Sequence, residues 1–325
     1  MGTIVGIPRA LAYHDYFPLW KVFLSSLGAE LAVSPPTSRA IVNEGVRLAV
    51  DGTCLPVKIF YGHVSWLIQA GVDSIFLPRL ISVAPKEYIC PKFMGLPDMT
   101  AAAFGSQARF ISPVVNLTRS PGLLHREMEG VGKGLGYSAR EIRKAWDQAA
   151  AAQRDYESFL QQGNWPAEYH CRGATEVAVD KPPGAPDLRI GLLGHNYVVY
   201  DSFASMDAVS RLRAMGAQVL TVDMLSPVKI EAQAARWPKR MFWTSGRRIL
   251  GAAWEYTEMS VDGIIYITAF GCGTDSLTAE LVERTVRRQS RIPQLILNID
   301  EHTGEAGVVT RLEAFVDMLR WRRTR

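Results

Sequence analysis

The sequence predicts an α/β protein with two doubly wound parallel-sheet domains and a helical segment between them. Its 325 residues are too many for one ordinary compact domain and fit two domains of about 150 residues each. Short apolar patterns typical of buried strands alternate with amphipathic helical patterns, and this alternation occurs twice along the chain. Such alternation indicates a mostly parallel sheet with helices on its faces.

The first alternation occupies residues 1–120, the predicted N-terminal domain. Its predicted strands are short apolar runs, at 3–8, 29–34, 72–79 and 108–115. Its predicted helices have apolar residues at helical spacing, at 16–28, 37–50 and 55–71. Thr37 and Ser38 give the second helix a capping signal, and Pro56 is tolerated in the first turn of the third.

A helical connector and linker is predicted for residues 121–185. Residues 138–163 form one long amphipathic pattern rich in Ala, Gln and charged side chains. The stretch KPPGAPD, at 181–187, is typical of a linker. The glycine-rich stretch GVGKGLG, at 130–136, lacks the pattern of a phosphate-binding loop, so we expect a flexible turn there.

The second alternation, residues 186–325, is the predicted C-terminal domain. Its predicted strands are again apolar runs, at 188–195, 217–224, 261–270 and 293–300. Helical patterns separate or follow them, at 203–215, 239–259, 275–290 and 307–323. Because ligands bind beyond the carboxyl ends of the strands in open α/β sheets, we expect the strand ends of both domains to face a shared cleft.

The composition argues against several classes of partner. Lys and Arg number 36 and Asp and Glu 32, an excess too small to indicate nucleic-acid binding. The C-terminal stretch RWRRTR is expected to be a solvated helix end. The N-terminus begins on a strand pattern rather than a signal peptide, and no stretch reaches the ~18 apolar residues of a membrane helix. We therefore expect a cytoplasmic protein with neither nucleic acid nor membrane as a partner.

Three of the four cysteines lie in predicted loops or helix starts. Cys272 follows a buried strand by two residues, between two glycines that permit a sharp turn. Cys90 precedes Pro91, which indicates a fixed turn. Cys54 lies at or just before a helix start, where a thiol pKa is lowered. Cys171 falls in the connector. Such wide spacing in a long chain without a secretion signal does not indicate a disulfide framework.

The spacing of these cysteines leaves three interpretations open. They are ordinary buried thiols, ligands of zinc, or ligands of an iron–sulfur cluster. Structural zinc sites usually contain closely spaced pairs of cysteines or histidines, and the sequence has no such pair. The ligands of an iron–sulfur cluster are thiolates, whose charge is stabilised by helix starts and by backbone N–H groups near glycine.

Other polar residues follow predicted strands of the C-terminal domain. His195 ends the strand pattern in GLLGHN and is either a site residue or a hydrogen-bonding residue of the turn. The stretch DEHTGEAG places Asp300, Glu301, His302 and Glu305 just after the last strand, at the same predicted edge as Cys272. It is either a solvated loop or a source of acid–base or partner contacts. The candidate catalytic residues are Glu301, His302 and His195.

Seven stretches of the sequence carry a family resemblance. They are GIPRAL, DGTCLPVK, GVDSIFLPR, YICPKFMGLPD, PKRMFWTSG, FGCGTDS and DEHTGEAG. Together they resemble the family related to acyl-CoA dehydratase activases. That family is akin to the iron–sulfur subunits of 2-hydroxyacyl-CoA dehydratases and benzoyl-CoA reductases, and to double-cubane cluster proteins. The resemblance extends over nearly the whole chain.

The resemblance implies two Rossmann-like domains with a [4Fe–4S] cluster held between them on three cysteines. Mapped residue by residue, the implied ligands are Cys54, Cys90 and Cys272, and Cys171 matches no motif of the family. An ATP-hydrolysing iron–sulfur activase is the implied electron donor. A homologous subunit or a second copy of the chain is a further implied partner.

The implied function is that of a low-potential oxidoreductase of anaerobic metabolism, acting on acyl-CoA thioesters or small molecules. The alternative is a non-enzymatic iron–sulfur electron carrier or partner protein in the same system. The chain is shorter than the dehydratase subunits and has no obvious substrate-specific insertion, which argues against binding of a CoA ester.

Overall fold

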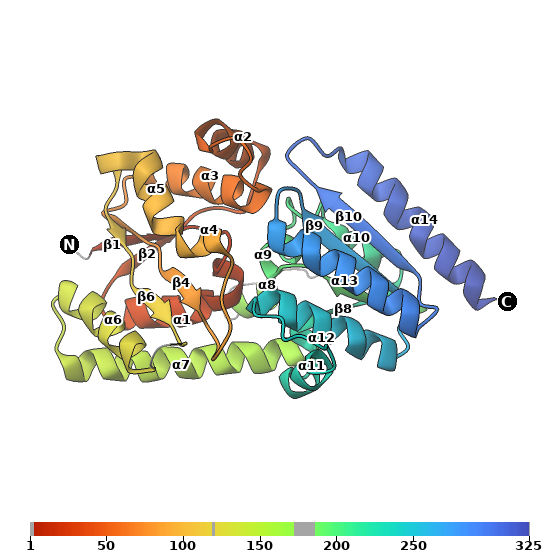
Figure 1. Cartoon of the computed structure of the whole chain (residues 1–325). Coiled ribbons are helices and arrows are strands. Elements are labelled where there is room, and N and C mark those ends of the chain that lie inside the picture. The colour runs from red at the N-terminus through yellow and green to blue at the C-terminus, as the bar shows by residue number, and fades with distance from the viewer. Residues whose placement is uncertain (1–2, 119–120, 172–185, 325) are drawn as a thin grey trace. The chain divides into compact units, whose positions relative to one another are not determined.

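The computed structural model (Figure 1) describes residues 3–118, 121–171 and 186–324. Most of the predicted linker at 181–187 lies outside the described residues. The chain divides into two compact units. Unit 1 consists of Met1–Thr53, Val57–Glu157 and Phe242–Thr244, and unit 2 consists of Cys54–Pro56, Ser158–Met241 and Ser245–Arg325.

Unit 1 contains a four-stranded parallel sheet with the strand order β2-β1-β3-β5. Its strands are β1 (Ile4–Ile7), β2 (Glu30–Val33), β3 (Ser74–Phe76) and β5 (Phe110–Ile111). A separate two-stranded parallel sheet pairs β4 (Arg79–Ser82) with β6 (Val114–Asn116). The helices are α1 (Tyr13–Ser26), α2 (Arg39–Leu48), α3 (Leu55–Gln69), α4 (Pro91–Met94), α5 (Leu96–Phe104), α6 (Pro121–Gly134) and α7 (Ala139–Gln161). The first two residues of α3 and the last four of α7 belong to unit 2.

Two strands predicted as continuous are divided in the structure. Leu77 N donates a hydrogen bond to the Ile111 carbonyl oxygen (2.8 Å), and Arg79 N donates one to the Pro113 carbonyl oxygen (2.9 Å). Pro78 lies between these two donors and has no N–H. Alternate residues of a strand donate to opposite sides, so the missing N–H faces the side on which β3 pairs with β1, not the side of β5 and β6. The chain segments beyond this break pair with each other as β4 and β6 rather than extending the main sheet.

Unit 2 contains a second four-stranded parallel sheet, with the strand order β10-β9-β7-β8. Its strands are β7 (Leu188–Leu193), β8 (Ala217–Thr221), β9 (Gly263–Ala269) and β10 (Gln294–Ile299). Its helices are α8 (Pro166–His170), α9 (Asn196–Val199), α10 (Ala208–Ala214), α11 (Pro227–Ala234), α12 (Thr244–Glu258), α13 (Gly273–Gln289) and α14 (Glu305–Arg323).

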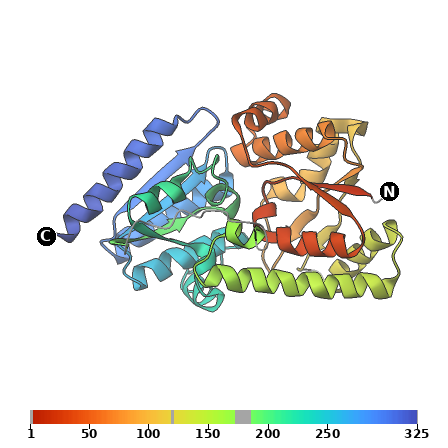
Figure 2. The ribbon, with the colours of Figure 1, turned by 180° about the vertical axis from the view of Figure 1, so that it is seen from behind.

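Helices cover both faces of the sheet in unit 2. Figures 1 and 2 show α12 and α13 on one face and α10 and α14 on the other. Two glycines in neighbouring strands leave room for the helices that pack on these faces. A Cβ atom on Gly191 would lie 2.5 Å from the Tyr256 ring of α12, and one on Gly263 would lie 2.8 Å from Leu319 of α14. The predicted α/β class, with two doubly wound parallel sheets, is confirmed.

Both units repeat one strand order. Counted along the strands of each four-stranded sheet, the second strand lies beside the first, the first beside the third and the third beside the fourth. The order therefore reverses between β1 and β3 in unit 1, and between β7 and β9 in unit 2. In sheets of this kind ligands bind beyond the carboxyl ends of the two strands that flank the reversal.

The prediction of a flexible turn at 130–136 is wrong for most of that stretch. Helix α6 continues to Gly134, and only the residues after it form a turn. A Cβ atom on Gly132 would lie 2.3 Å from the Ile142 side chain of α7. Glycine is needed here because the two helices approach closely, not because the backbone must bend.

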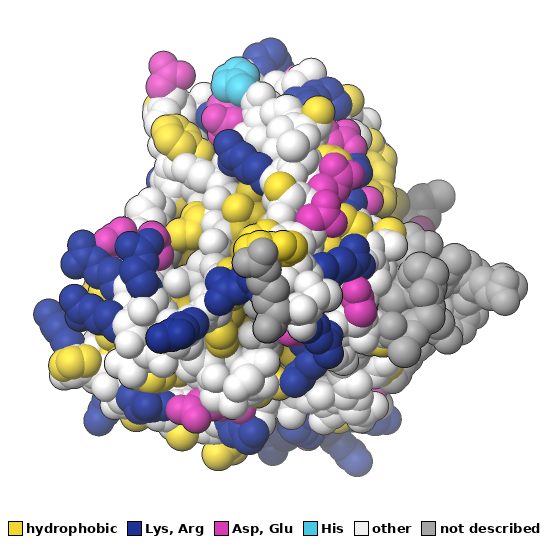
Figure 3. All heavy atoms as spheres, turned by 90° about the vertical axis from the view of Figure 1, so that its right-hand side faces the viewer, with side chains coloured by type: hydrophobic (Ala, Val, Ile, Leu, Met, Phe, Trp, Pro, Cys, Tyr) yellow, Lys and Arg dark blue, Asp and Glu magenta, His cyan; other side chains and the backbone are white. Residues whose placement is uncertain are grey.

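The C-terminal residues through Thr324 form an exposed helix end, as predicted, with basic side chains in the last turn of α14. On the face shown in Figure 3, basic side chains lie in separate groups with acidic side chains among them. This distribution fits the small excess of basic residues. Among the described residues, no helix is both long and apolar enough to cross a membrane.

A buried histidine makes the stability of unit 1 depend on pH. His63 of α3 is fully buried, with Nδ1 2.9 Å from Ser34 Oγ and Nε2 3.0 Å from Thr37 Oγ1. Burial, and then the charge of Arg9, lower the pKa of His63 to about 3. The ordinary pKa is about 6.5, so below that pH the unfolded chain binds a proton that the folded chain does not bind. Protonation therefore favours unfolding as the pH falls from 6.5 toward 3.

We expect the free energy of unfolding to fall by about 2 kcal/mol between pH 7 and pH 5 because of His63. Urea unfolding at the two pH values measures this difference. His63→Gln should remove most of it, whereas His125→Gln, at an exposed position of α6, should leave it unchanged. An equal fall in wild type and His63→Gln would show that other groups cause the pH dependence.

Candidate functional site

The turn that carries Cys272 follows β9. This strand is buried along its whole length, and the chain leaves it through Phe270 and Gly271. Gly271 has a φ of +77°, a left-handed conformation that glycine adopts without strain. Cys272 is thereby placed at the N-cap of α13, where its carbonyl oxygen accepts a hydrogen bond from Ser276 N (3.0 Å). Its sulfur lies at the positive end of the helix dipole.

His195 occupies the matching position after β7, at the N-cap of α9. Gly194, just before it, has a φ of +148°, and a Cβ atom there would lie 2.6 Å from the Ile267 carbonyl oxygen of β9. Glycine therefore allows the end of β7 to pass close to β9. Tyr197 stacks on the His195 ring, with centroids 4.8 Å apart and planes 10° apart. These contacts fix the position of the imidazole.

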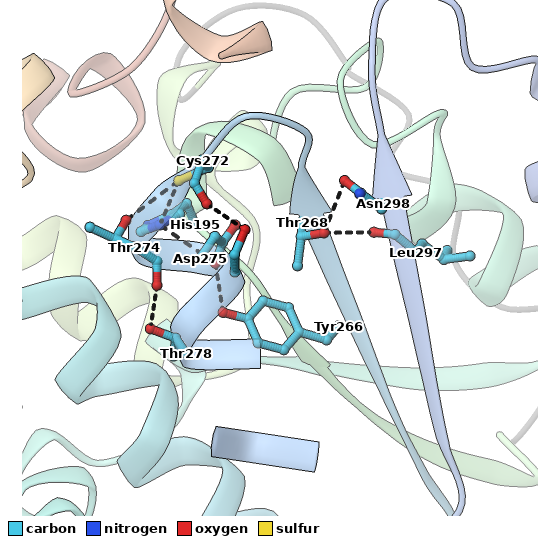
Figure 4. Close-up of polar contacts among 10 residues, drawn as sticks. His195, Tyr266, Thr268, Cys272, Thr274, Asp275, Thr278, Leu297 and Asn298 are labelled. Carbon is cyan, nitrogen blue, oxygen red and sulfur yellow. Dashed lines mark hydrogen bonds and ion pairs between the residues drawn. The ribbon is translucent and has the colours of Figure 1, made fainter. Parts of the chain in front are cut away.

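The two turns bring three potential metal ligands together at the carboxyl edge of the sheet (Figure 4). The Cys272 sulfur lies 4.0 Å from His195 Nε2, which lies 3.6 Å from Asp275 Oδ1. One ligand atom from each of these residues lies within 4.8 Å of the other two. We refer to His195, Cys272 and Asp275 as the His–Cys–Asp group. It stands where the strand order of unit 2 reverses, between β7 and β9.

Asp275 is the most deeply buried member of this group, with 1% of its surface exposed. Its Oδ1 accepts a hydrogen bond of 2.6 Å from the Tyr266 hydroxyl. Burial, and then the negative charge of Asp275, raise the pKa of Tyr266 well above its ordinary value, so the phenol stays a hydrogen-bond donor. The other carboxylate oxygen, Oδ2, is buried and has no hydrogen-bond partner among the described residues.

The surroundings of Cys272 favour its thiolate form. Burial raises the pKa of the thiol, but the hydrogen bond and the positive charge of His195 lower it more. Asp275 raises this pKa, and the hydroxyl of Thr274, 3.4 Å from the sulfur, lowers it. The pKa of Cys272 lies below its ordinary value as a result. A thiolate is the form that acts as a metal ligand or nucleophile.

Cys54, Cys90 and Cys272 each stand directly before the first residue of a helix, namely α3, α4 and α13. The prediction that these three cysteines lie in loops or at helix starts is therefore confirmed. Cys171 stands at the opposite kind of position, the C-cap of α8. The dipole of a helix stabilises an anion at its N-terminus and disfavours one at its C-terminus. The position of Cys171 therefore disfavours a thiolate, whereas the positions of the other three cysteines favour one.

Cys54 and Cys272 belong to unit 2, whereas Cys90 belongs to unit 1. Within unit 2, Cys54 lies beside the turn before Cys272, since a Cβ atom on Gly271 would lie 3.4 Å from Cys54 Cα. Cys54 and Cys272 are buried and Cys90 is partly exposed. Convergence of the three cysteines on one cluster, and the cleft that both domains were expected to share, stay predictions.

The polar loop after β10 is organised by Asp300. Its Oδ1 accepts hydrogen bonds from Thr303 Oγ1 (2.7 Å) and from His302 N (3.0 Å), and the Thr303 hydrogen bond is the main cause of the lowered pKa of Asp300. The side chain of His302 is 85% exposed, whereas that of Glu301 is mostly buried. Glu305 forms an ion pair with Arg211. The loop lies at the same sheet edge as the His–Cys–Asp group but contributes no residue to it.

Sequence reasoning missed three residues of this site. Asp275 and Thr274 lie in the stretch FGCGTDS, and Tyr266 lies within the preceding strand. Asp275 follows Cys272 by three residues, a spacing that places two side chains on one face of a helix. That signal was present in the sequence. The hydrogen bond between Tyr266 and Asp275 depends on how α13 packs over β9. The pattern of apolar residues along the sequence does not predict that packing.

Tyr266→Phe is expected to lower the free energy of unfolding by about 2 kcal/mol, because it removes a hydrogen bond to a buried carboxylate. Urea unfolding of Tyr266→Phe, Asp275→Asn and the double variant measures this interaction. The double-mutant cycle should give a coupling energy of about 1 kcal/mol or more between the two side chains. A coupling energy near zero would contradict the hydrogen bond.

Comparisons with known proteins find two matching families along the chain. Residues 4–225 match the family described as the CoA enzyme activase uncharacterised domain. Residues 204–319 match the family described as 2-hydroxyglutaryl-CoA dehydratase, D-component. A search of curated proteins finds no match. The first matching region contains Cys54, Cys90 and His195, and the second contains Cys272 and Asp275.

Proposed function

Because this chain belongs to the family of the CoA enzyme activase uncharacterised domain and also matches the dehydratase D-component, we propose that it is an iron–sulfur protein of an activase-dependent reductase or dehydratase system. Cys54, Cys90 and Cys272 hold one [4Fe–4S] cluster. When bound, such a cluster supplies one-electron transfer at low potential. Three protein ligands leave one iron open to water, substrate or another ligand.

The observation that carries this proposal is the position of Cys272. Its thiol is buried, lies at the start of α13 and has a lowered pKa. Cys54 and Cys90 share the helix-start position, and Cys54 lies beside the turn that carries Cys272. Thiolates are the ligands that iron–sulfur clusters use, and hydrogen bonds to their sulfurs set the cluster potential. The donor set therefore fits the cluster that the family resemblance implies.

The proposed partner is an ATP-hydrolysing iron–sulfur activase in the cytoplasm, which delivers electrons one at a time to the cluster. The proposed electron acceptor is an acyl-CoA thioester or a small molecule. The match to a dehydratase D-component supports this class of system, since the name of that family refers to a CoA thioester.

Anaerobic purification followed by iron and acid-labile sulfide analysis tests the cofactor. We expect about four iron and four sulfide per chain. After chemical reduction, the protein should give the electron paramagnetic resonance signal of a reduced [4Fe–4S] cluster. Zinc without sulfide in protein made under strictly anaerobic conditions would contradict the proposal.

A second experiment decides between an enzyme and an electron carrier. The purified protein is mixed with an activase of the family, a reductant, and either ATP or a non-hydrolysable analogue. Cluster reduction that requires ATP hydrolysis supports the proposed partnership. Consumption of an acyl-CoA thioester or a small-molecule acceptor in the same mixture identifies an enzyme, whereas cluster reduction without consumption identifies a carrier.

A further inference from the structure

The His–Cys–Asp group combines three different donor atoms in one buried place. An imidazole nitrogen comes from the turn after β7, and a sulfur and a carboxylate come from the first turn of α13. The exposed fraction is 7% for His195, 7% for Cys272 and 1% for Asp275. Figure 4 shows the three side chains directed toward one another. Nitrogen, sulfur and oxygen donors together suit Zn²⁺ and Fe²⁺ better than Mg²⁺ or Ca²⁺, which prefer oxygen alone.

The distances within the group decide between one metal ion and a cluster. Bond lengths to zinc of roughly 2.0–2.3 Å place two ligand atoms of one tetrahedral ion about 3.5 Å apart. The Cys272 sulfur is 4.0 Å from His195 Nε2, and that nitrogen is 3.6 Å from Asp275 Oδ1. These two distances need to shorten by a few tenths of an ångström, and the third, between the Cys272 sulfur and the Asp275 carboxylate, lies within 4.8 Å and needs to shorten by about 1 Å at most. In a [4Fe–4S] cluster each iron takes one protein ligand, so three donors that meet at one point fit a single ion better than they fit a cluster.

A hydrogen-bond network accounts for this group less well than a metal ion. The 3.6 Å between His195 Nε2 and Asp275 Oδ1 exceeds the 2.7–3.2 Å range of an N–H···O hydrogen bond. Asp275 Oδ2 is buried and has no hydrogen-bond partner among the described residues. A buried carboxylate is costly unless it is paired or coordinates a metal. A cation within the group neutralises this buried carboxylate, whose oxygen nearest to His195 Nε2 is Oδ1.

The surroundings hold the three donors in the orientation that a metal ion needs. The Tyr266 hydroxyl fixes the Asp275 carboxylate through Oδ1, and Tyr197 stacks on the His195 ring. Ligands of metal ions are commonly oriented by such neighbours, whose removal weakens binding. All of these residues belong to unit 2, so the site does not depend on the position of unit 1.

We propose that His195, Cys272 and Asp275 bind a single divalent ion, Zn²⁺ or Fe²⁺, with a fourth coordination position open. The Cys272 thiol loses its proton to solvent on binding. This inference rests on the proposed function only in that both use the Cys272 thiolate. The single ion and the cluster therefore exclude each other. The single ion binds when Cys54 and Cys90 do not hold a cluster together with Cys272.

The test uses the full-length protein, freed of metal by a chelator and kept reduced under anaerobic conditions. Co²⁺ is the probe, because thiolate-bound Co²⁺ gives a charge-transfer band and tetrahedral Co²⁺ gives intense visible bands. We expect one Co²⁺ per chain in wild type and in the matched controls Cys54→Ser, Cys90→Ser and Cys171→Ser. Addition of one equivalent of Zn²⁺ should abolish both bands.

Single substitutions in the His–Cys–Asp group test the contribution of each ligand to Co²⁺ binding. Cys272→Ser should lose the charge-transfer band. His195→Gln and Asp275→Asn should raise the dissociation constant for Co²⁺ more than about tenfold. Circular dichroism of each variant checks that it is folded. A second substitution, His195→Ala, repeats the test of the imidazole if the first variant unfolds.

Cluster content and Co²⁺ binding distinguish this inference from the proposed function. A wild-type protein that assembles a cluster, but whose metal-free form binds no Co²⁺, overturns the single-ion site alone. One that binds Co²⁺ but assembles no cluster overturns the proposed function alone. If Cys54→Ser or Cys90→Ser weakens Co²⁺ binding as much as Cys272→Ser, the ion lies on the cysteines and the single-ion site is wrong. Retained binding in those two controls, with loss in His195→Gln, supports it.

Discussion

Serine in place of Cys54, Cys90 or Cys272 is expected to remove most of the iron from anaerobically purified protein, whereas serine in place of Cys171 leaves the iron near the wild-type level. Each of the first three cysteines precedes a helix, where backbone N–H groups and the helix dipole stabilise a thiolate. Cys171 stands at a helix C-terminus, where the dipole opposes a negative charge.

Serine is a stringent replacement at these positions because it is one of the best N-cap residues. The helix start is therefore preserved while the thiolate is lost, and a fall in iron content does not arise from a lost cap. Iron and sulfide per chain are measured for the four variants side by side, with circular dichroism as a check of folding. Full iron content in any of the first three variants, or its loss in Cys171→Ser, would refute the ligand assignment.

Gly45→Ala is expected to lower the free energy of unfolding by about 3 kcal/mol, because the added methyl group has no room. A Cβ atom on Gly45 of α2 would lie 1.8 Å from the Lys58 carbonyl oxygen of α3. A Cβ atom on Gly62 of α3 would lie 1.9 Å from the Ile41 carbonyl oxygen of α2. The two helices thus touch through their backbones at a pair of glycines. Relief requires them to separate, which opens the packing between them.

Gly130→Ala is the matched control, since Gly130 is also inside a helix of unit 1 but a Cβ atom there would meet nothing within 4 Å. It should raise stability by about 0.5–1 kcal/mol, because alanine is the better helix former. Urea unfolding midpoints of both variants against wild type measure the contrast. Equal stability of Gly45→Ala and wild type would show that α2 and α3 are farther apart than described.

Local sequence signals predicted the elements well where those signals were strong. The apolar runs at 188–195 and 261–270 correspond to β7 and β9, and the helical pattern at 55–71 corresponds to α3. The neighbours of the cysteines were also informative. Two glycines around Cys272 and a proline after Cys90 indicated turns, and both residues lie at helix N-caps. These predictions rest on backbone chemistry close in sequence.

Features that depend on distant partners were predicted less well. The strand predicted at 72–79 is divided at Pro78, and its second part pairs as β4 with β6, a segment more than thirty residues later. Gly132 lies within a glycine-rich stretch, but it is needed for contact with Ile142 rather than for a turn. The meeting of His195 with Cys272 follows from the strand order of unit 2. A pattern read along the chain does not specify which strands become neighbours.

A cysteine just before a helix lies between a loop and a helix, and these two segments respond differently to an inserted residue. Upstream lies a connection whose lengthening by one residue costs only a few tenths of a kcal/mol in closure entropy. Downstream lies a helix, in which one inserted residue rotates everything after it by about 100° and turns its packed face away from the sheet. The proposed ligands Cys54 and Cys90 are therefore insulated from insertions in the segments that precede them, whereas only Phe270 and Gly271 separate Cys272 from β9. A site built from such positions keeps its geometry when the number of residues between its ligands changes.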